Sequence, residues 1–189
     1  MRILYGGAFN PPTLAHFKIV KYLTNKYPNS ELILLPTNNY YFKKELVPIT
    51  DRIKMLELLC NEIDSKHIIV SDYEAHLNEY QGTYYILQAF NNPYFVIGAD
   101  SLAKIDKWIK FPNIIIENKF IVFPRSGYNI EDTINKNEIL KAHSDNFVIA
   151  SDFKKINISS SLFRRSSDNK YLLKSIDEYI KKNKLYEVN

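Results

Sequence analysis

The chain has 189 residues, of which 46% are hydrophobic and 24% are charged, and its formal net charge is +4. These values exclude a disordered or fibrous protein and predict one soluble domain spanning residues 1–189. The mild basic excess contains no run of like charges. A phosphate-rich small substrate explains it as well as nucleic acid does, and we expect no nucleic-acid partner.

The predicted elements alternate along the chain. Short apolar runs predict strands at residues 3–5, 32–35, 68–70, 94–97, 120–123 and 147–149. Helical spacing or capping residues predict helices at 14–23, from Thr50, at 83–90, at 101–108, from Ser159 or Ser160, and at 173–180. Residues 38–48 and 127–136 are predicted loops. This alternation predicts an α/β fold, a Rossmann-like parallel sheet with helices on both faces, whose ligands bind beyond the carboxyl ends of the strands.

The cysteine content and the apolar runs bear on location. Cys60 is the single cysteine, and it lies in an apolar helical stretch, so the sequence holds neither a disulfide framework nor zinc-ligand spacing. We expect Cys60 in the core. No signal peptide precedes the first strand, and no apolar run approaches 18 residues. A cytoplasmic protein without a membrane partner is the resulting expectation.

The first predicted strand runs directly into a glycine turn and a helix. Gly6 and Gly7 carry no β-carbon, so the backbone there can come close to a phosphate. Two prolines then end the strand, and Thr13 is the expected N-cap of the helix, whose free N–H groups would face an anion. His16 follows three residues later, so its side chain shares a face of the first turn with Thr13. The segment has the parts of a nucleotide site in order.

Five motifs resemble those of one enzyme family. Residues 7–16, Gly-Ala-Phe-Asn-Pro-Pro-Thr-Leu-Ala-His, resemble the (H/T)xGH signature of the nucleotidyltransferase superfamily. Residues 52–56 resemble its RxxML helix, and residues 158–164 resemble its ISSTxIR segment. Residues 95–102 with Trp108 resemble the GxDxL…W segment of nicotinate-nucleotide adenylyltransferases, and Tyr179-Ile180 with Leu185-Tyr186 resemble their YI…LY ending.

This resemblance implies a reaction and its partners. ATP and nicotinate mononucleotide would give nicotinate adenine dinucleotide and pyrophosphate in NAD biosynthesis, with Mg²⁺ carried on ATP and no metal ligands on the protein. The mononucleotide phosphate would attack the α-phosphorus in line, without a covalent enzyme intermediate. Alternative acceptors are nicotinamide mononucleotide and phosphopantetheine, and a non-catalytic nucleotide sensor is the alternative from another class. Homo-oligomer formation is left open.

The resemblance also implies site residues. The catalytic set is His16, Thr13 and Arg164, with His16 stabilising charge on the transferring phosphate. ATP would contact Gly6, Gly7, Ala8, Phe9, Thr13, His16, Gly98, Asp100, Ser160, Ser161 and Arg164. The mononucleotide would contact Lys43, Lys44, Thr83, Tyr84, Tyr85 and Trp108.

Several of these residues have structural alternatives. Thr13 and Asp100 could act only as helix caps, and Trp108 could be a core residue. Arg52 is expected as a salt-bridge partner on a helix surface, and Glu74 receives no role. Tyr85 stands where the family has a threonine, which leaves open the choice between nicotinate and nicotinamide.

Overall fold

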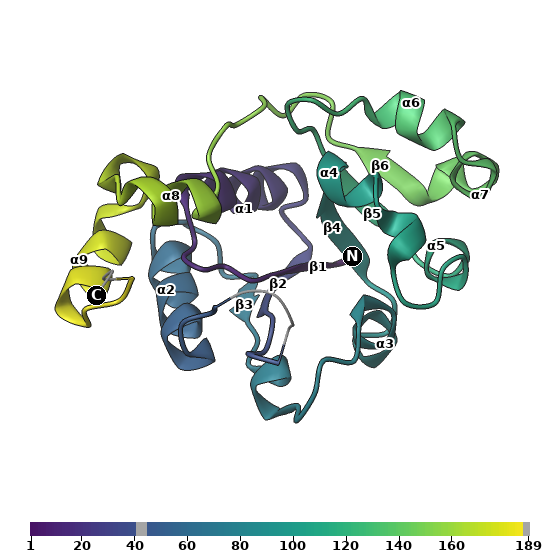
Figure 1. The fold of residues 1–189 in the computed structure, drawn as a ribbon. Coiled ribbons are helices and arrows are strands. Elements are labelled where there is room, and N and C mark those ends of the chain that lie inside the picture. The colour runs from purple at the N-terminus through teal and green to yellow at the C-terminus, as the bar shows by residue number, and fades with distance from the viewer. Residues whose placement is uncertain (41–44, 187–189) are drawn as a thin grey trace. The chain divides into compact units, whose positions relative to one another are not determined.

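The computed structural model describes residues 1–40 and 45–186. In this part of the chain six strands follow the order β3-β2-β1-β4-β5-β6. The chain forms two compact units: unit 1 contains Met1–Tyr5 and Gln81–Asn157, and unit 2 contains Gly6–Tyr80 and Ile158–Asn189. Figure 1 labels the helices and strands of the chain. Strand β1 (Arg2–Gly7) begins in unit 1 and ends in unit 2. One domain over residues 1–189 stays a prediction.

Unit 1 is built on parallel strands. Here β1 pairs with β4 (Tyr94–Gly98), β4 with β5 (Phe120–Phe123), and β5 with β6 (Phe147–Ile149). All four residues of β5 are buried, as expected for a strand of a parallel sheet covered on both faces. The Phe120 and Phe147 rings stack with centroids 5.5 Å apart across β5 and β6. The core of this unit therefore lies along its central strands.

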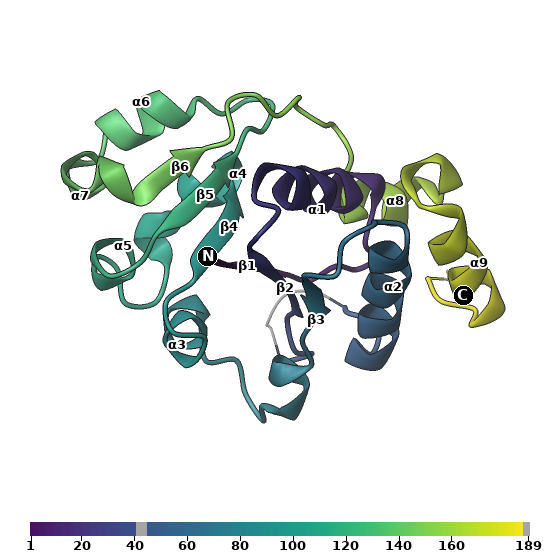
Figure 2. The ribbon, with the colours of Figure 1, turned by 180° about the vertical axis from the view of Figure 1, so that it is seen from behind.

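Short helices complete unit 1. They are α3 (Thr83–Ala89), α4 (Ala99–Leu102), α5 (Asn113–Ile116), α6 (Ile130–Asn135), α7 (Glu138–Ala142) and the 3-10 turns η2 (Ile105–Lys107) and η3 (Ser144–Asn146). Figure 2 shows α6 and α7 beside β5 and β6. Because these helices have at most seven residues, tertiary packing rather than helix propensity maintains them.

Unit 2 contains the parallel pair β2 (Glu31–Pro36) and β3 (Ile68–Val70). Its helical elements are α1 (Leu14–Lys26), α2 (Ile49–Asn61), η1 (Tyr73–His76), α8 (Ser160–Ser166), η4 (Asn169–Tyr171) and α9 (Lys174–Lys182). In both views α9 lies against α2, and the Tyr179 hydroxyl donates to Asp51 Oδ1 at 2.8 Å (Figures 1 and 2). Burial, together with this bond, raises the pKa of Tyr179 to about 12.

The predicted parallel α/β fold is confirmed, and each predicted strand lies within two residues of the observed one. Residues 127–136 are not only a loop, because they contain α6, whose first turn is capped by the Asn129 side chain accepting from Asp132 N–H at 3.1 Å. Six residues offer too little periodicity for a sequence-based helix prediction. Helix α2 begins at Ile49 after Pro48 rather than at a Thr50 cap.

Two further differences concern single side chains. The predicted helix 101–108 is two separate turns, α4 and η2, and Trp108 follows the second of them. Cys60, expected in the core, is half-buried on α2. Burial nevertheless raises the pKa of its thiol to about 12, so the thiolate is scarce at neutral pH.

Candidate active site

The loop between β1 and α1 fixes the ring of His16. Thr13 is the N-cap of α1, as predicted, and its backbone N–H donates to His16 Nδ1 at 2.9 Å. Because an amide N–H can only donate, Nδ1 must accept, and the neutral ring then carries its proton on Nε2. The Phe9 ring lies edge-on to the imidazole with centroids 5.1 Å apart. The donor of the ring is thus Nε2–H.

Thr13 itself is completely buried. Its hydroxyl oxygen also lies 2.9 Å from His16 Nδ1. This position favours a role in capping α1 and orienting His16, and a direct contact between Thr13 and phosphate stays a prediction. Phe9 is likewise buried, and its backbone has a left-handed φ of 44°; a contact between Phe9 and ATP stays a prediction.

Helix α8 is bonded to the same loop. The Ser159 side chain caps α8 by accepting from Leu162 N–H at 3.1 Å, and the Ser160 hydroxyl donates to the Pro11 carbonyl at 2.8 Å. Arg164 Nη1 donates to the Asn10 carbonyl, and its Nη2 lies 3.4 Å from the Ser161 hydroxyl. The two segments predicted to bind phosphate are therefore adjacent within unit 2, although they are about 150 residues apart in sequence.

Arg52 was expected on a helix surface, and this expectation is wrong because the residue is fully buried. Its Nη1 donates to the Ala8 carbonyl at 2.9 Å, and its Nε donates to the Val47 carbonyl at 3.0 Å. Its Nη2 donates to Asn39 Oδ1 at 3.0 Å. Burial lowers the pKa of Arg52 to about 10, so the guanidinium stays charged at neutral pH. Arg52 thus supports the backbone of the loop that leads to His16.

Glu74 is a buried carboxyl that the sequence did not mark. It lies in η1, and its Oε2 accepts from Asn38 N–H at 2.9 Å. The Asn38 side chain in turn donates from Nδ2 to the Glu79 carbonyl at 2.9 Å. Burial raises the pKa of Glu74, while the Asn38 hydrogen bond and the Arg52 charge oppose this effect. Desolvation therefore dominates at this carboxyl.

In unit 1, an ion pair lies where β4 and β5 end. Asp100 is in the first turn of α4, and its Oδ1 lies 3.6 Å from Arg125 Nε. The Asp100 carboxylate folds back over Gly98, where a β-carbon would collide with it. Gly98, rather than Asp100, is the N-cap of α4. Sequence reasoning missed Arg125, although a basic residue two positions after a buried strand is the signal that could have found it.

The predicted mononucleotide residues that the structure describes lie in unit 1 and differ in exposure. Thr83 begins α3 and is half-buried, whereas Tyr84 is buried and its hydroxyl donates to Glu117 Oε2 at 2.7 Å. Tyr85 is 41% exposed. Half-buried Trp108 packs edge-on to Phe95 with centroids 6.2 Å apart, so part of the indole is accessible. Lys43 and Lys44 lie outside the described residues.

Lys110 adds a cation near this group. Its Nζ lies 5.9 Å from the centroid of the Tyr85 ring. The neighbouring Ile109 packs on Gly82, which has a φ of 92° and where a β-carbon would lie 2.7 Å from Ile109 Cδ1. Glycine is needed at this position both for its backbone angle and for the room it leaves. The contact holds residues 109–110 next to the start of α3.

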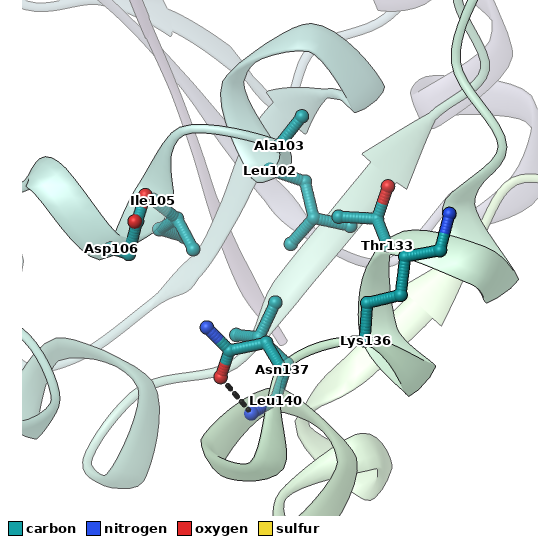
Figure 3. A pocket seen from close by; sticks show the side chains of 8 residues that line it. All are labelled: Leu102, Ala103, Ile105, Asp106, Thr133, Lys136, Asn137 and Leu140. Carbon is teal, nitrogen blue, oxygen red and sulfur yellow. Dashed lines mark hydrogen bonds between the residues drawn. The ribbon is translucent and has the colours of Figure 1, made fainter.

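A separate hollow of about 280 Å³ lies elsewhere in unit 1 (Figure 3). Leu102, Ile105 and Leu140 give it an apolar lining, and Asn137 accepts at its rim from Leu140 N–H at 3.2 Å. None of the predicted site residues lines it. No lining residue therefore connects this hollow with the predicted chemistry.

Residues 1–40 and 45–186 contain no group of three or more His, Cys, Asp or Glu side chains arranged to hold a metal ion. Their helices are all too short or too polar to cross a membrane.

Residues 4–166 match the model of the cytidylyltransferase-like family. The chain belongs to this family. A relative from Acholeplasma laidlawii, named "Probable nicotinate-nucleotide adenylyltransferase", is 32% identical over 99% of this chain and 98% of its own length. A relative of the same name from Clostridium acetobutylicum is 33% identical over 98% of both chains. The resemblance predicted from the motifs is thereby confirmed.

Solved structures of the family share the fold. Two structures of the nicotinic acid mononucleotide adenylyltransferase of Plasmodium falciparum, one complexed with APC and one with NaAD, each superpose with a TM-score of 0.80. Each is 24% identical to this chain and covers 100% of it and 98% of the other chain. The arrangement of strands and helices is therefore that of the family.

The buried carboxyl gives a prediction for stability. The pKa of Glu74 is higher in the folded state than its ordinary value near 4.5. Once the pH exceeds that ordinary pKa, the unfolded state therefore binds fewer protons than the folded state. The contribution of Glu74 to the free energy of unfolding is therefore fully present below pH 4.5 and falls as the pH rises. Glu74→Gln does not titrate and still accepts from Asn38 N–H. We expect its melting temperature, relative to that of the natural protein, to rise between pH 5 and pH 8.

Thermal unfolding at several pH values measures this difference. Glu79→Gln, the same replacement at an exposed carboxyl, is the matched control. A difference for Glu74→Gln that is constant from pH 5 to pH 8 would contradict the prediction.

Proposed function

We propose that the protein is a nicotinate-nucleotide adenylyltransferase, which transfers the adenylyl group of ATP to nicotinate mononucleotide and releases pyrophosphate. Family membership and close relatives of that name over the whole chain support this activity. The observation that carries the chemistry is the hydrogen bonding of α8, through Ser160 and Arg164, to the loop between β1 and α1, called the His16 loop because it leads to His16. It places a serine cluster, a guanidinium and an oriented imidazole in one part of unit 2.

His16 would act as a hydrogen-bond donor rather than as a base. Its Nδ1 is occupied by Thr13 N–H, so Nε2–H is the group that can reach an α-phosphate oxygen. Negative charge shifts onto the phosphate oxygens as the bond to pyrophosphate breaks, and a fixed donor stabilises that state more than the ground state. Since the attacking mononucleotide phosphate is already an anion, the reaction needs no enzyme nucleophile and no general base.

We propose that Mg²⁺ arrives as part of the ATP substrate. The side chains at the His16 loop are hydroxyls, an imidazole and a guanidinium, which suit phosphate oxygens. Mg²⁺ prefers carboxylates and phosphate oxygens. Triphosphate oxygens are therefore the fitting ligands, and the chain's own residues orient the phosphates. A cytoplasmic location agrees with this substrate.

The mononucleotide would bind through unit 1. The accessible part of Trp108 offers a flat surface for a pyridine ring. Tyr84 is engaged with Glu117, whereas half-buried Thr83, the exposed Tyr85 and the nearby Lys110 remain for the pyridine substituent. A lysine attracts a carboxylate more than an amide, and we therefore propose nicotinate rather than nicotinamide mononucleotide as the preferred acceptor.

A substrate panel tests the proposed reaction. The protein is incubated with ATP, Mg²⁺ and one acceptor, either nicotinate mononucleotide, nicotinamide mononucleotide or phosphopantetheine, and pyrophosphate is measured. We expect the fastest release with nicotinate mononucleotide. Release only with phosphopantetheine would point to a different transferase, and release with none of the three would favour a nucleotide sensor.

Removal of the imidazole tests the role of His16. His16→Ala should lower kcat by about a hundredfold or more, the usual effect of losing one transition-state donor. His16→Asn, whose amide can still donate, should retain more turnover than His16→Ala. Turnover of His16→Ala within a few-fold of the natural protein would remove His16 from this role.

Lys110 offers a test of acceptor choice. Lys110→Gln should reduce the ratio of kcat/KM for nicotinate over nicotinamide mononucleotide by about tenfold, the scale of one charged hydrogen bond. Lys107→Gln, an exposed lysine in η2, is the control and should leave the ratio unchanged. An unaltered ratio for Lys110→Gln would assign the selectivity to other groups.

A further inference from the structure

Tyr186 lies beyond α9, in the YI…LY segment that the proposed reaction does not use. Its hydroxyl donates to Asn10 Oδ1 at 2.7 Å. Its ring packs edge-on to Phe163 of α8, with centroids 5.8 Å apart. One side chain therefore touches both the loop that leads to His16 and the helix that carries Arg164. All of these residues belong to unit 2.

Asn10 connects four segments of unit 2. Its side chain is almost completely buried, and its Nδ2 donates to the Glu45 carbonyl at 2.9 Å. Its Oδ1 accepts from Val47 N–H at 3.3 Å as well as from Tyr186. Its backbone carbonyl accepts from Arg164 Nη1. The orientation of Asn10 thus depends on partners before α2, on α8 and after α9.

The backbone at Tyr186 is unusual for a residue with a side chain. Its φ is 63°, and that of Lys184 is 51°, both in the left-handed region that favours glycine. Such a conformation persists where surrounding contacts require it. The Asn10 hydrogen bond and the Phe163 contact are the interactions that hold Tyr186 there. Burial also raises the pKa of Tyr186, so the phenol stays neutral and can donate.

We propose that Tyr186 is a positioning residue for ATP. Its hydroxyl fixes Asn10, and Asn10 in turn presents its carbonyl to Arg164 and leads into the turn that orients His16. Tyr186 itself touches no phosphate. This inference rests on the proposed function in one respect, since it takes the His16 loop and Arg164 as the ATP site.

Tyr179 provides a matched control for this role. It lies on α9, seven residues before Tyr186, and its hydroxyl also donates to a side-chain oxygen, Asp51 Oδ1, at 2.8 Å. That bond joins α9 to α2 and does not involve the His16 loop. Tyr179→Phe and Tyr186→Phe each remove one hydroxyl from a phenol and keep the ring. A purely structural role would give both variants the same behaviour.

Steady-state kinetics with varied ATP separate the two roles. Tyr186→Phe should raise KM for ATP or lower kcat/KM for ATP by about tenfold, the scale of one hydrogen bond, with KM for nicotinate mononucleotide unchanged. Tyr179→Phe should lower the melting temperature with ATP kinetics within twofold of the natural protein. Natural ATP kinetics for Tyr186→Phe, or equal kinetic losses in both variants, would overturn the proposal.

A double-mutant cycle tests the route through Asn10. Because both side chains act on Asn10, the effect of Tyr186→Phe on kcat/KM for ATP should be smaller in an Arg164→Lys background than in the natural protein. Full additivity of the two changes would show that Tyr186 acts independently of Arg164 and would overturn the route.

Direct binding distinguishes failure of this inference from failure of the proposed reaction. Calorimetry with ATP and Mg²⁺, without any acceptor, should show weaker binding by Tyr186→Phe than by Tyr179→Phe. This comparison holds even if no acceptor releases pyrophosphate. Equal ATP affinity in the two variants would overturn only the role of Tyr186, whereas a natural protein that binds no ATP would overturn both proposals.

Discussion

The hydrogen bonding of the buried Arg52 guanidinium is the interaction on which the loop between β1 and α1 depends. Removing a cation from water is costly, and the cost is offset only when hydrogen bonds replace its hydration. Here the acceptors are the carbonyls of Ala8 and Val47 and the amide oxygen of Asn39. Backbone and side-chain oxygens thus replace the water around the charge. The need to hydrogen-bond the guanidinium in turn fixes the path of the chain toward Asn10.

At the start of α1, too, one hydrogen bond serves two purposes. In a capping box the third helical residue reaches back to the N-cap N–H, usually with the carboxylate or amide of Glu or Gln. Here His16 occupies that position and accepts from Thr13 N–H through Nδ1. The bond from Thr13 N–H to His16 Nδ1 therefore both caps the N-terminus of α1 and selects the tautomer of the imidazole. Substituting a carboxylate at this position would keep the cap but place a negative charge where the proposed mechanism uses a hydrogen-bond donor.

How far the sequence predicted this structure depended on the range of the interactions involved. The strands, the Thr13 cap and the helix start at Ser159 or Ser160 follow from patterns within a few residues, and they are confirmed. The burial of Arg52 was not predictable, because its partners lie 5 to 44 residues away and an arginine on a helix is usually exposed.

Residues of the candidate site show the same limit. Two motifs that resemble phosphate-binding segments predicted that the loop and α8 bind the same ATP, but not that the two bond directly to each other. The Asp100–Arg125 pair needed knowledge of which strand ends are neighbours. Tyr84, placed at the substrate by resemblance, has its hydroxyl bound to Glu117, a partner 33 residues away that the sequence pattern did not indicate. Its neighbour Tyr85 points to solvent instead, because adjacent helical residues face different sides.

The poorly ionised thiol of Cys60 has a practical consequence. The thiolate is the nucleophile that adds to a maleimide, and at pH 7 very little of the Cys60 thiol is in that form. Cysteines introduced at exposed positions, one in each compact unit, would therefore react with fluorescent maleimide dyes while Cys60 stays unlabelled. Energy transfer between such dyes would report in solution how the separation of the two units responds to nucleotide, without altering the chain's only sulfhydryl.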